Sequence, residues 1–143
     1  MVLNHVKIKK LVEHCLNEDV GSGDLTTIAT IPPDAVSTGY IVAKEDGVIA
    51  GLPLAREVFT QLDPAIQFRE MIREGEKVAR GRVLAEVTGS ARAILTGERL
   101  ALNFLQRLSG IATRTAGLVE LVGGEKACVT DTRKTTPGLR MIE

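Results

Sequence analysis

A short apolar run near the end of the chain most constrains what this sequence can fold into. Ala127 to Asp131 has the composition of a buried strand, and it follows a helical segment that Gly123 and Gly124 close. A helix, a tight turn and an apolar strand form half of a βα unit, and a parallel sheet needs several such units. We therefore expect one domain over residues 1–108, the start of a second over residues 109–143, and a truncated chain.

Cations gather directly after this apolar run. The segment Thr130–Arg140 reads TDTRKTTPGLR and places Arg133, Lys134 and Arg140 among small hydroxyl residues. The whole chain has no net charge, because 18 Lys and Arg residues balance 18 Asp and Glu residues. The positive charge is therefore a local feature of this segment.

Composition excludes several classes of protein. Apolar residues make up 44% of the 143 residues and charged residues 25%, as in a soluble globular protein. Balanced charge and only 3% aromatic residues argue against a nucleic-acid surface. No apolar run approaches the roughly 18 residues of a membrane span, and the N-terminus lacks the apolar stretch of a signal peptide. We expect a cytoplasmic protein with no nucleic-acid or membrane partner.

The cysteines and histidines show no ligand pattern. Cys15 and Cys128 lie far apart in apolar contexts, which predicts reduced, packed thiols. His5 and His14 lie near the N-terminus without a second group at ligand spacing, so the sequence predicts no metal site.

The first part of the chain predicts a helix followed by a glycine-rich turn. Apolar residues recur at helical spacing from Val6 to Leu16. Gly21, Ser22 and Gly23 then break the pattern, and Asp24 can accept hydrogen bonds from nearby amides. Such a turn could cradle a phosphate, but no strand precedes it and neither GxGxxG nor a phosphate-loop lysine is present. A structural turn is the favoured interpretation.

The middle of the chain has the pattern of short strands. The stretch from Ser37 predicts a strand, a turn at Glu45–Gly47, a second short strand and a helix that begins near Pro53. Further turns are expected at Glu74–Gly75 and Arg80–Gly81, and Val83–Val87 is a good strand. Short strands with a few helices indicate an α+β sandwich.

A long helix is expected to follow, with Ser90 as its N-cap and Leu108 near its end. Gly97 allows close packing on an apolar face made of Ile94, Ala101, Phe104, Leu105 and Leu108. The opposite side carries Arg92, Arg99, Asn103 and Gln106, which helical periodicity alone assigns to a solvated face. A break at Ser109–Gly110 and a second helix that ends at Gly123–Gly124 complete the prediction.

Four stretches of the sequence together resemble one enzyme family. NEDVGSGDLTT, KEDGVIAGL, GERLALNFLQRLSGIATRT and DTRKTTPGLR occur in the order and at the spacing found in quinolinate phosphoribosyltransferase, the carboxylating nicotinate-nucleotide pyrophosphorylase. The resemblance covers nearly the whole chain but only about the first half of a family member. It implies an N-terminal α/β sandwich and then an incomplete, TIM-like α/β barrel. It also implies the conversion of quinolinate and phosphoribosyl pyrophosphate to nicotinate mononucleotide, carbon dioxide and pyrophosphate.

The resemblance assigns roles to the cations at the end of the chain. In the family, DTRKT follows the first barrel strand, and such barrels place their sites at the C-terminal ends of strands. Thr132, Arg133 and Lys134 are then expected to contact the carboxylates and phosphates of the two substrates, which Arg recognises best through paired hydrogen bonds. The alternative is that Arg133 and Lys134 pair with acids of the barrel. A Pro-Gly turn separates Arg140 from them, so a structural role is favoured for Arg140.

The resemblance also implies a shared active site. In the family, the Arg of GER, here Arg99, reaches into the site of the neighbouring subunit, which overturns its assignment to a solvated face. We therefore expect a homodimer or a higher homo-oligomer. Mg²⁺ is expected to bind with phosphoribosyl pyrophosphate through ligands beyond residue 143. No catalytic residue is assigned within these 143 residues, and the fragment alone is expected to be inactive.

Three alternatives remain open from the sequence. GEKVARGRVLAEV resembles the hairpin of biotinyl and lipoyl carrier domains, although Lys44 and Lys77 lack the flanking residues of a modified lysine. A related phosphoribosyltransferase that acts on nicotinate, or a molybdenum-associated paralogue, would share the fold. The third alternative is that the chain as given has no activity and only folds or dimerises.

Overall fold

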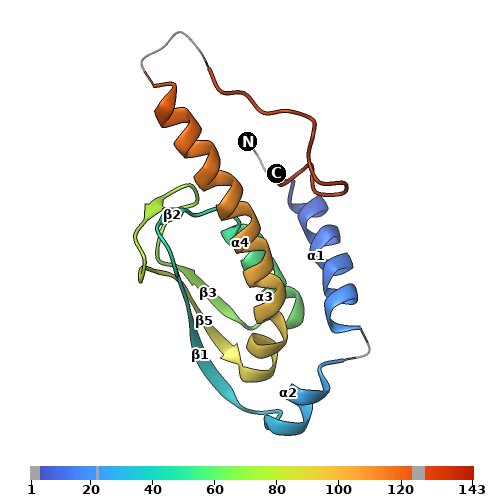
Figure 1. Ribbon diagram of the computed structural model, residues 1–143. Helices are drawn as coiled ribbons and strands as arrows, with labels where there is room; N and C mark the ends of the chain where they lie inside the picture. The colour runs from blue at the N-terminus through green and yellow to red at the C-terminus, as the bar shows by residue number, and fades with distance from the viewer. Residues whose placement is uncertain (1–3, 22, 124–127) are drawn as a thin grey trace.

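The computed structural model describes residues 4–21, 23–123 and 128–143 (Figure 1). Helices and strands are mixed along the chain, which confirms the α+β class. The elements, in chain order, are α1 (His5–Val20), α2 (Leu25–Thr30), β1 (Val36–Val42), β2 (Gly47–Val48), α3 (Leu52–Leu62), β3 (Gln67–Glu70), β4 (Lys77–Val78), β5 (Val83–Ser90) and α4 (Ala91–Leu121).

Two antiparallel sheets form the β-part of the fold. Three strands pair in the order β1-β5-β3, with Gly39 and Phe68 on either side of Val87, and β2 pairs with β4. Alternation along the strands separates the two faces of the larger sheet. Phe68 and Val87 are buried against the helices, whereas Tyr40 on β1 is 61% exposed. The strands predicted between Ser37 and Val87, and the turns between them, are thus confirmed.

Helices α3 and α4 pack side by side between the larger sheet and α1 (Figure 1). Helix α3 begins where predicted, with Pro53 in its first turn and the Glu74 carboxylate accepting hydrogen bonds from the amides of Gly51 and Leu52 at 2.6 and 3.0 Å. Gly97 of α4 is the point of close approach, because a Cβ there would lie 3.0 Å from the Phe59 ring. The core lies at this three-layer contact.

Helix α4 differs from its prediction, because it runs without a break through Ser109 and Gly110 to Leu121. The Ser109 hydroxyl accepts a hydrogen bond from the amide of Ala50 at 3.0 Å, and the Thr113 hydroxyl accepts one from the amide of Val48 at 2.9 Å. These side chains satisfy the edge of β2 without leaving the helical conformation. None of the helices in the described ranges, including α4, is long and apolar enough to cross a membrane.

The polar face of α4 is also partly corrected. Arg99, Asn103 and Gln106 are exposed, as periodicity predicted. Arg92 is half-buried instead, and its guanidinium donates to the carbonyl oxygens of Ile31 and Ile28 at 2.8 and 3.1 Å. It satisfies carbonyl groups at the C-terminal end of α2, which a helix leaves without internal partners.

The two cysteines are free but not equally packed. Cys15 is half-buried against the core, and burial, followed by the nearby Glu18 carboxylate, raises the pKa of its thiol. Cys128 is exposed, so the expectation that it is packed is wrong.

The C-terminal segment, residues 128–143, is irregular or turned throughout. Residues 128–131 belong to neither sheet, so the strand expected from Ala127 to Asp131 is not formed there, while Ala127 itself lies outside the described residues. A strand needs a neighbour for its backbone groups, and the described residues provide no other strand of a parallel sheet. Helix α4 ends at Leu121, close to the end predicted at Gly123–Gly124. Gly124 itself lies outside the described residues.

Candidate functional site

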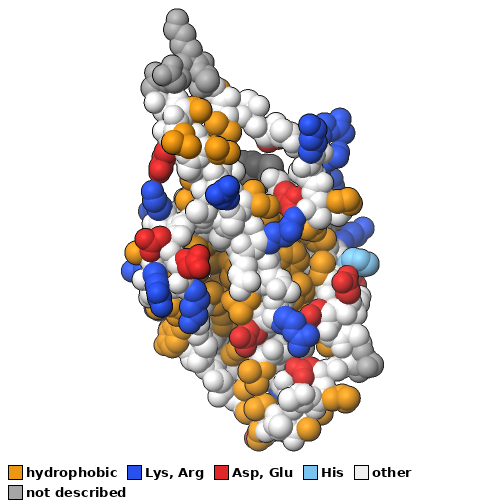
Figure 2. All heavy atoms as spheres, viewed as in Figure 1, with side chains coloured by type: hydrophobic (Ala, Val, Ile, Leu, Met, Phe, Trp, Pro, Cys, Tyr) orange, Lys and Arg blue, Asp and Glu red, His pale blue; other side chains and the backbone are white. Residues whose placement is uncertain are grey.

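The cations of the C-terminal segment face solvent. Thr132, Arg133 and Lys134 are all exposed, and the Thr132 hydroxyl accepts a hydrogen bond from the amide of Lys134 at 3.1 Å. Figure 2 shows Lys and Arg side chains gathered over this segment, at the upper right of the view. Arg140 donates to the carbonyl oxygen of Arg133 at 3.2 Å, in keeping with the structural role expected for it. The sequence-predicted cluster is therefore present as an accessible cationic loop.

Arg107 attaches the C-terminal segment, residues 128–143, to α4, and the sequence analysis did not identify it. Its Nε donates to the Glu143 carboxylate at 2.6 Å, and its Nη2 donates to the Thr136 hydroxyl. The same carboxylate accepts a hydrogen bond from the amide of Thr136 at 2.8 Å, and this bond, followed by those from Arg107, lowers the pKa of Glu143. Arg107 lies eight residues after Arg99, on the same helix face, so the periodicity of α4 could have found it.

Arg99 lies on the first half of α4 and reaches toward α1. Its Nη1 lies 3.5 Å from Oδ1 of Asp19, in the last turn of α1. The Arg99 side chain is 74% exposed, whereas that of Asp19 is only 19% exposed. The guanidinium is thus held at one nitrogen while most of it remains open to solvent.

Next to this pair, the Asp24 carboxylate joins the start of α2 to α4. It accepts hydrogen bonds from the amide and the hydroxyl of Thr27 at 3.0 and 2.5 Å, and from the hydroxyl of Thr96 at 3.2 Å. The bonds from Thr27, then those from Thr96 and the charge of Arg99, lower the pKa of Asp24. The bond from the Thr27 amide confirms the predicted hydrogen bonding of Asp24, while the turn predicted at Gly21–Gly23 includes Ser22, which lies outside the described residues. The helix that Asp24 caps, α2, was not predicted.

The two groups of cations lie at opposite ends of α1 within one chain. Arg99 contacts Asp19 in the last turn of α1, whereas the C-terminal segment returns to the start of that helix (Figure 1). A rise of 1.5 Å per residue separates these two ends by about 20 Å. The structure therefore does not bring Arg99 together with Arg133 and Lys134 in a single chain.

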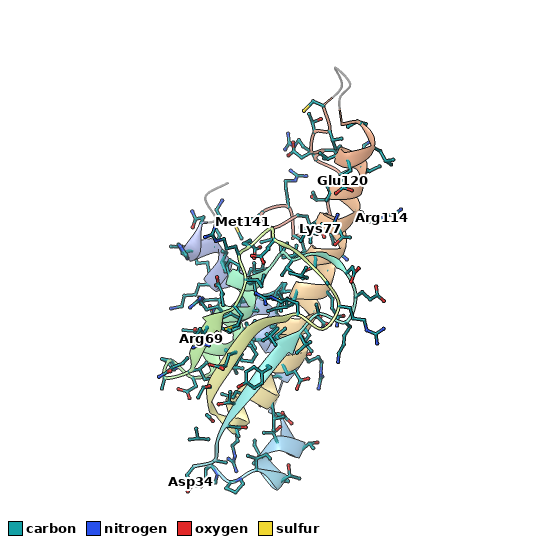
Figure 3. All side chains as sticks on the ribbon, turned by 90° about the vertical axis from the view of Figure 1, so that its left-hand side faces the viewer. Asp34, Arg69, Lys77, Arg114, Glu120 and Met141 are labelled. Carbon is teal, nitrogen blue, oxygen red and sulfur yellow. The ribbon has the colours of Figure 1, made fainter. Side chains whose placement is uncertain are left out.

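The second half of α4 carries two shallow grooves. One, of about 720 Å³, lies beside Arg107, Ile111 and Leu118, and the other, of about 580 Å³, lies beside Val119 and Ile142. Figure 3 shows Arg114 pointing outward from this half of the helix, while Lys77 and Glu120 face each other. The Lys77 Nζ and Glu120 Oε1 atoms are 3.1 Å apart, which ties β4 to α4.

Within the described ranges, no three His, Cys, Asp or Glu side chains come together as possible metal ligands.

Comparison with protein families matches both halves of the chain. The model of the quinolinate phosphoribosyl transferase N-terminal domain matches residues 24–109, and that of the C-terminal domain matches residues 111–143. The first match alone covers more than half of the chain and contains Asp24, Arg99 and Arg107. The chain belongs to the quinolinate phosphoribosyltransferase family.

Named relatives agree with this assignment. A probable nicotinate-nucleotide pyrophosphorylase (carboxylating) of Bacillus subtilis is 45% identical over 141 residues, which are 99% of this chain and 48% of that protein. A quinolinate phosphoribosyltransferase (decarboxylating) of Nicotiana tabacum is 42% identical over 95% of this chain and 39% of its own length. The chain therefore spans about half the length, or less, of the curated relatives that it matches.

Solved structures of the family match the fold closely. NadC from Streptococcus pyogenes has a TM-score of 0.95 at 41% identity, covering 99% of this chain and 50% of that one. The human nicotinic acid phosphoribosyltransferase has a TM-score of 0.60 at 15% identity, covering 98% of this chain and 33% of that one, and so shares only the fold. Against the carrier-domain alternative, Lys77 lies in β4 and pairs with Glu120 of α4 instead of standing free at a hairpin tip.

Proposed function

We propose that the full-length protein carrying this sequence is a quinolinate phosphoribosyltransferase of NAD biosynthesis, a pentosyltransferase. It joins quinolinate to phosphoribosyl pyrophosphate and forms nicotinate mononucleotide, carbon dioxide and pyrophosphate. The observation that carries the proposal is the exposed cationic loop Thr132–Lys134 in a chain of this family. The described residues do not include the rest of the barrel, and the isolated fragment is proposed to be inactive.

In this proposal the loop binds the anionic groups of both substrates. Quinolinate is a dicarboxylate, and phosphoribosyl pyrophosphate carries a 5′-phosphate and a pyrophosphate. The Arg133 guanidinium can donate two parallel hydrogen bonds to a carboxylate or phosphate, whereas Lys134 supplies a compact point charge. The Thr132 hydroxyl can add a further donor. The exposure of all three side chains supports this role, because none is used up in the core.

Arg99 is proposed to complete the site of a neighbouring subunit in a homodimer or a higher homo-oligomer. The separation of about 20 Å along α1 supports this arrangement, since one chain keeps Arg99 away from its own cationic loop. The exposed guanidinium can reach a partner without disturbing the core.

Three further assignments belong to the same proposal. Mg²⁺ binds with phosphoribosyl pyrophosphate through residues beyond the described ones. The sandwich domain covers residues 1–108 and the barrel begins at residue 109, which the change of family model between residues 109 and 111 supports. The protein is cytoplasmic, as its composition suggests.

A mixing experiment tests the shared site. The full-length Arg99→Ala and Arg133→Ala variants are each expected to lose at least about tenfold in kcat/KM, as for a lost charge-assisted contact of ~1.5–3 kcal/mol. When the two impaired variants are mixed and allowed to exchange subunits, each mixed dimer regains one intact site. Random pairing makes about half of the dimers mixed, so activity should return to roughly a quarter of wild type.

The possible outcomes are distinct. If Arg99 acts within its own chain, each site of a mixed dimer carries one defect, and no activity returns. If Arg99 is only a solvated side chain, its single variant stays near wild type, because surface substitutions usually change little. An Arg133→Ala variant that keeps full activity would contradict the role of the cationic loop.

A further inference from the structure

Although the Arg99 side chain is mostly exposed, it contacts a carboxylate of its own chain. Its Nη1 lies 3.5 Å from the Asp19 carboxylate, and 74% of the side chain is exposed. Of its several guanidinium nitrogens, only Nη1 has a hydrogen-bond partner within the described residues. An exposed ion pair of this kind contributes little to folding. Its main physical consequence is to restrict the directions in which a long, flexible side chain can point.

Asp19 is itself held in place. Its side chain is only 19% exposed, in the last turn of α1, which ends at Val20. The amide of Gly23 donates to the carbonyl oxygen of Val20 at 2.9 Å and fixes the chain as it leaves the helix. Asp19 therefore offers Arg99 a largely buried carboxylate from a helix end whose exit is hydrogen-bonded.

A second connection joins the same loop to α4. Thr96, one turn before Arg99, donates to the Asp24 carboxylate at 3.2 Å, and Asp24 is also bound by Thr27. The hydrogen bonds from Thr27 lower the pKa of Asp24 below its ordinary value of 3.8, so Asp24 is charged at neutral pH. The end of α1, the start of α2 and the Arg99 turn of α4 thus form one hydrogen-bonded unit.

We propose that Asp19 is a positioning residue that aims the Arg99 guanidinium out of its own chain, toward the substrate site of the neighbouring subunit. Arg99 then enters that site with fewer orientations to lose, which favours binding of the dicarboxylate substrate. This inference rests on the proposed function, because it requires that Arg99 contact substrate. It adds that a carboxylate 80 residues earlier in the chain determines how well Arg99 does so.

Steady-state kinetics of the full-length Asp19→Asn variant test this inference. We expect KM for quinolinate to rise about three- to tenfold, as for loss of a partly screened charged contact. The value of kcat is expected to stay within about twofold, since positioning affects the bound orientation more than the chemistry. Asp19→Glu keeps the charge and should restore most of the wild-type KM.

Glu18→Gln is the matched control. It removes one negative charge from the same helical turn, but Glu18 is exposed and has no side-chain hydrogen bond or ion pair within the described residues. Its KM should equal that of wild type. Equal effects of Asp19→Asn and Glu18→Gln would overturn the inference, because a general change of surface potential would then explain both.

A double-mutant cycle separates positioning from loss of stability. In the Arg99→Ala background, Asp19→Asn should not weaken quinolinate binding further, as measured by calorimetric titration. A loss of the same size in both backgrounds would show that Asp19 acts independently of Arg99 and would refute the inference. If Arg99→Ala itself leaves quinolinate binding unchanged, the proposed function of Arg99 fails. If only Asp19→Asn is silent, the inference fails and the proposed function stands.

Discussion

At the scale of single residues, the Asp24 carboxylate accepts hydrogen bonds from two elements that are far apart in the sequence. Thr27 belongs to α2, which Asp24 caps, and Thr96 belongs to α4, 72 residues further on. One short side chain therefore both begins a helix and fastens it to the longest helix of the described chain. Its negative charge also lies near Arg99. The physical basis of both contacts is that an ionised carboxylate accepts several hydrogen bonds at once.

We predict that Asp24 makes the stability of the fold depend on pH. Its pKa in the folded chain lies below the ordinary value of 3.8, so the unfolded chain binds a proton more readily than the folded chain does. The contribution of Asp24 is complete above the unfolded pKa and is lost as pH falls through the lowered, folded pKa. Thermal melting of the Asp24→Asn variant between about pH 5 and pH 2 should therefore show a shallower loss of Tm than wild type.

A second acidic group and a control variant bear on this prediction. Glu143 has a lowered pKa as well, so some acid sensitivity should remain in the Asp24→Asn variant. Asp34→Asn serves as the control, because Asp34 is exposed at the end of the loop before β1. A pH profile of Asp24→Asn parallel to that of wild type would show that the Asp24 hydrogen bonds do not stabilise the folded state.

At the scale of secondary-structure elements, α4 organises the fold by contacting most of the other elements along its length. Gly97 allows α3 to approach, since a Cβ there would lie 2.8 Å from Leu62 and 3.0 Å from Phe59. In the second half of α4, the Ser109 and Thr113 hydroxyls bind the backbone of Ala50 and Val48, at and beside β2. The helix can serve both sheets because small and hydroxyl side chains face its neighbours where space is limited.

Alanine substitution at two glycines of α4 should isolate the packing contribution. Both Gly97→Ala and Gly110→Ala gain about 1 kcal/mol of intrinsic helix propensity. At Gly110 nothing lies within 4 Å of the new Cβ, whereas at Gly97 the neighbouring side chains must shift. The free energy of unfolding of Gly97→Ala should therefore be lower than that of Gly110→Ala by about 1–3 kcal/mol.

Urea denaturation of the two variants measures this difference directly. Equal free energies of unfolding would mean that α3 and α4 do not meet at Gly97 as closely as the fold requires. A Gly110→Ala variant stabilised by about 1 kcal/mol would support the unbroken helix through Ser109 and Gly110, since alanine exceeds glycine by that amount within a helix.

At the scale of the whole molecule, the second half of α4 extends past the core and presents apolar side chains to solvent. Leu118, Val119 and Leu121 are 55%, 49% and 81% exposed. Figure 2 shows hydrophobic side chains gathered at this end of the helix. The same residues fall within the match to the C-terminal domain of the family, in relatives about twice as long as this chain. Contiguous exposed apolar surface of this kind promotes association.

We predict that the 143-residue chain alone self-associates through this end of α4. Sedimentation analysis at increasing concentration should show oligomers, and a Leu118→Glu, Leu121→Glu double variant should shift the chain toward monomer. Leu95→Glu is the control, because Leu95 is also an exposed leucine of α4, at 44%, but lies near its other end. Equal behaviour of the double variant and the control would place the association elsewhere.

The candidate site could be predicted only in part. The motif DTRKT pointed to Thr132, Arg133 and Lys134 through a family resemblance, and their exposure agrees with a binding role. Periodicity placed Arg99 on the polar face of α4 but carried no information on Asp19, which lies 80 residues away in the chain. Periodicity could place Arg107 on the exposed side of α4, but not its role, because its partners, Thr136 and Glu143, meet it only through the return of the C-terminal segment.

The sequence by itself determined the local features of this protein: the hydrogen bond from a nearby amide to Asp24, the N-cap at Ser90, the turns between the strands, and the short strands of the sandwich. These features depend on neighbouring residues, whose preferences a short stretch of chain already contains. Tertiary structure alone decided that α4 continues through Ser109, that Arg92 binds α2, and that residues 128–131 form no strand here. In each case the outcome depends on a hydrogen-bonding partner distant in sequence, or on its absence from the described chain, and local patterns do not encode that partner.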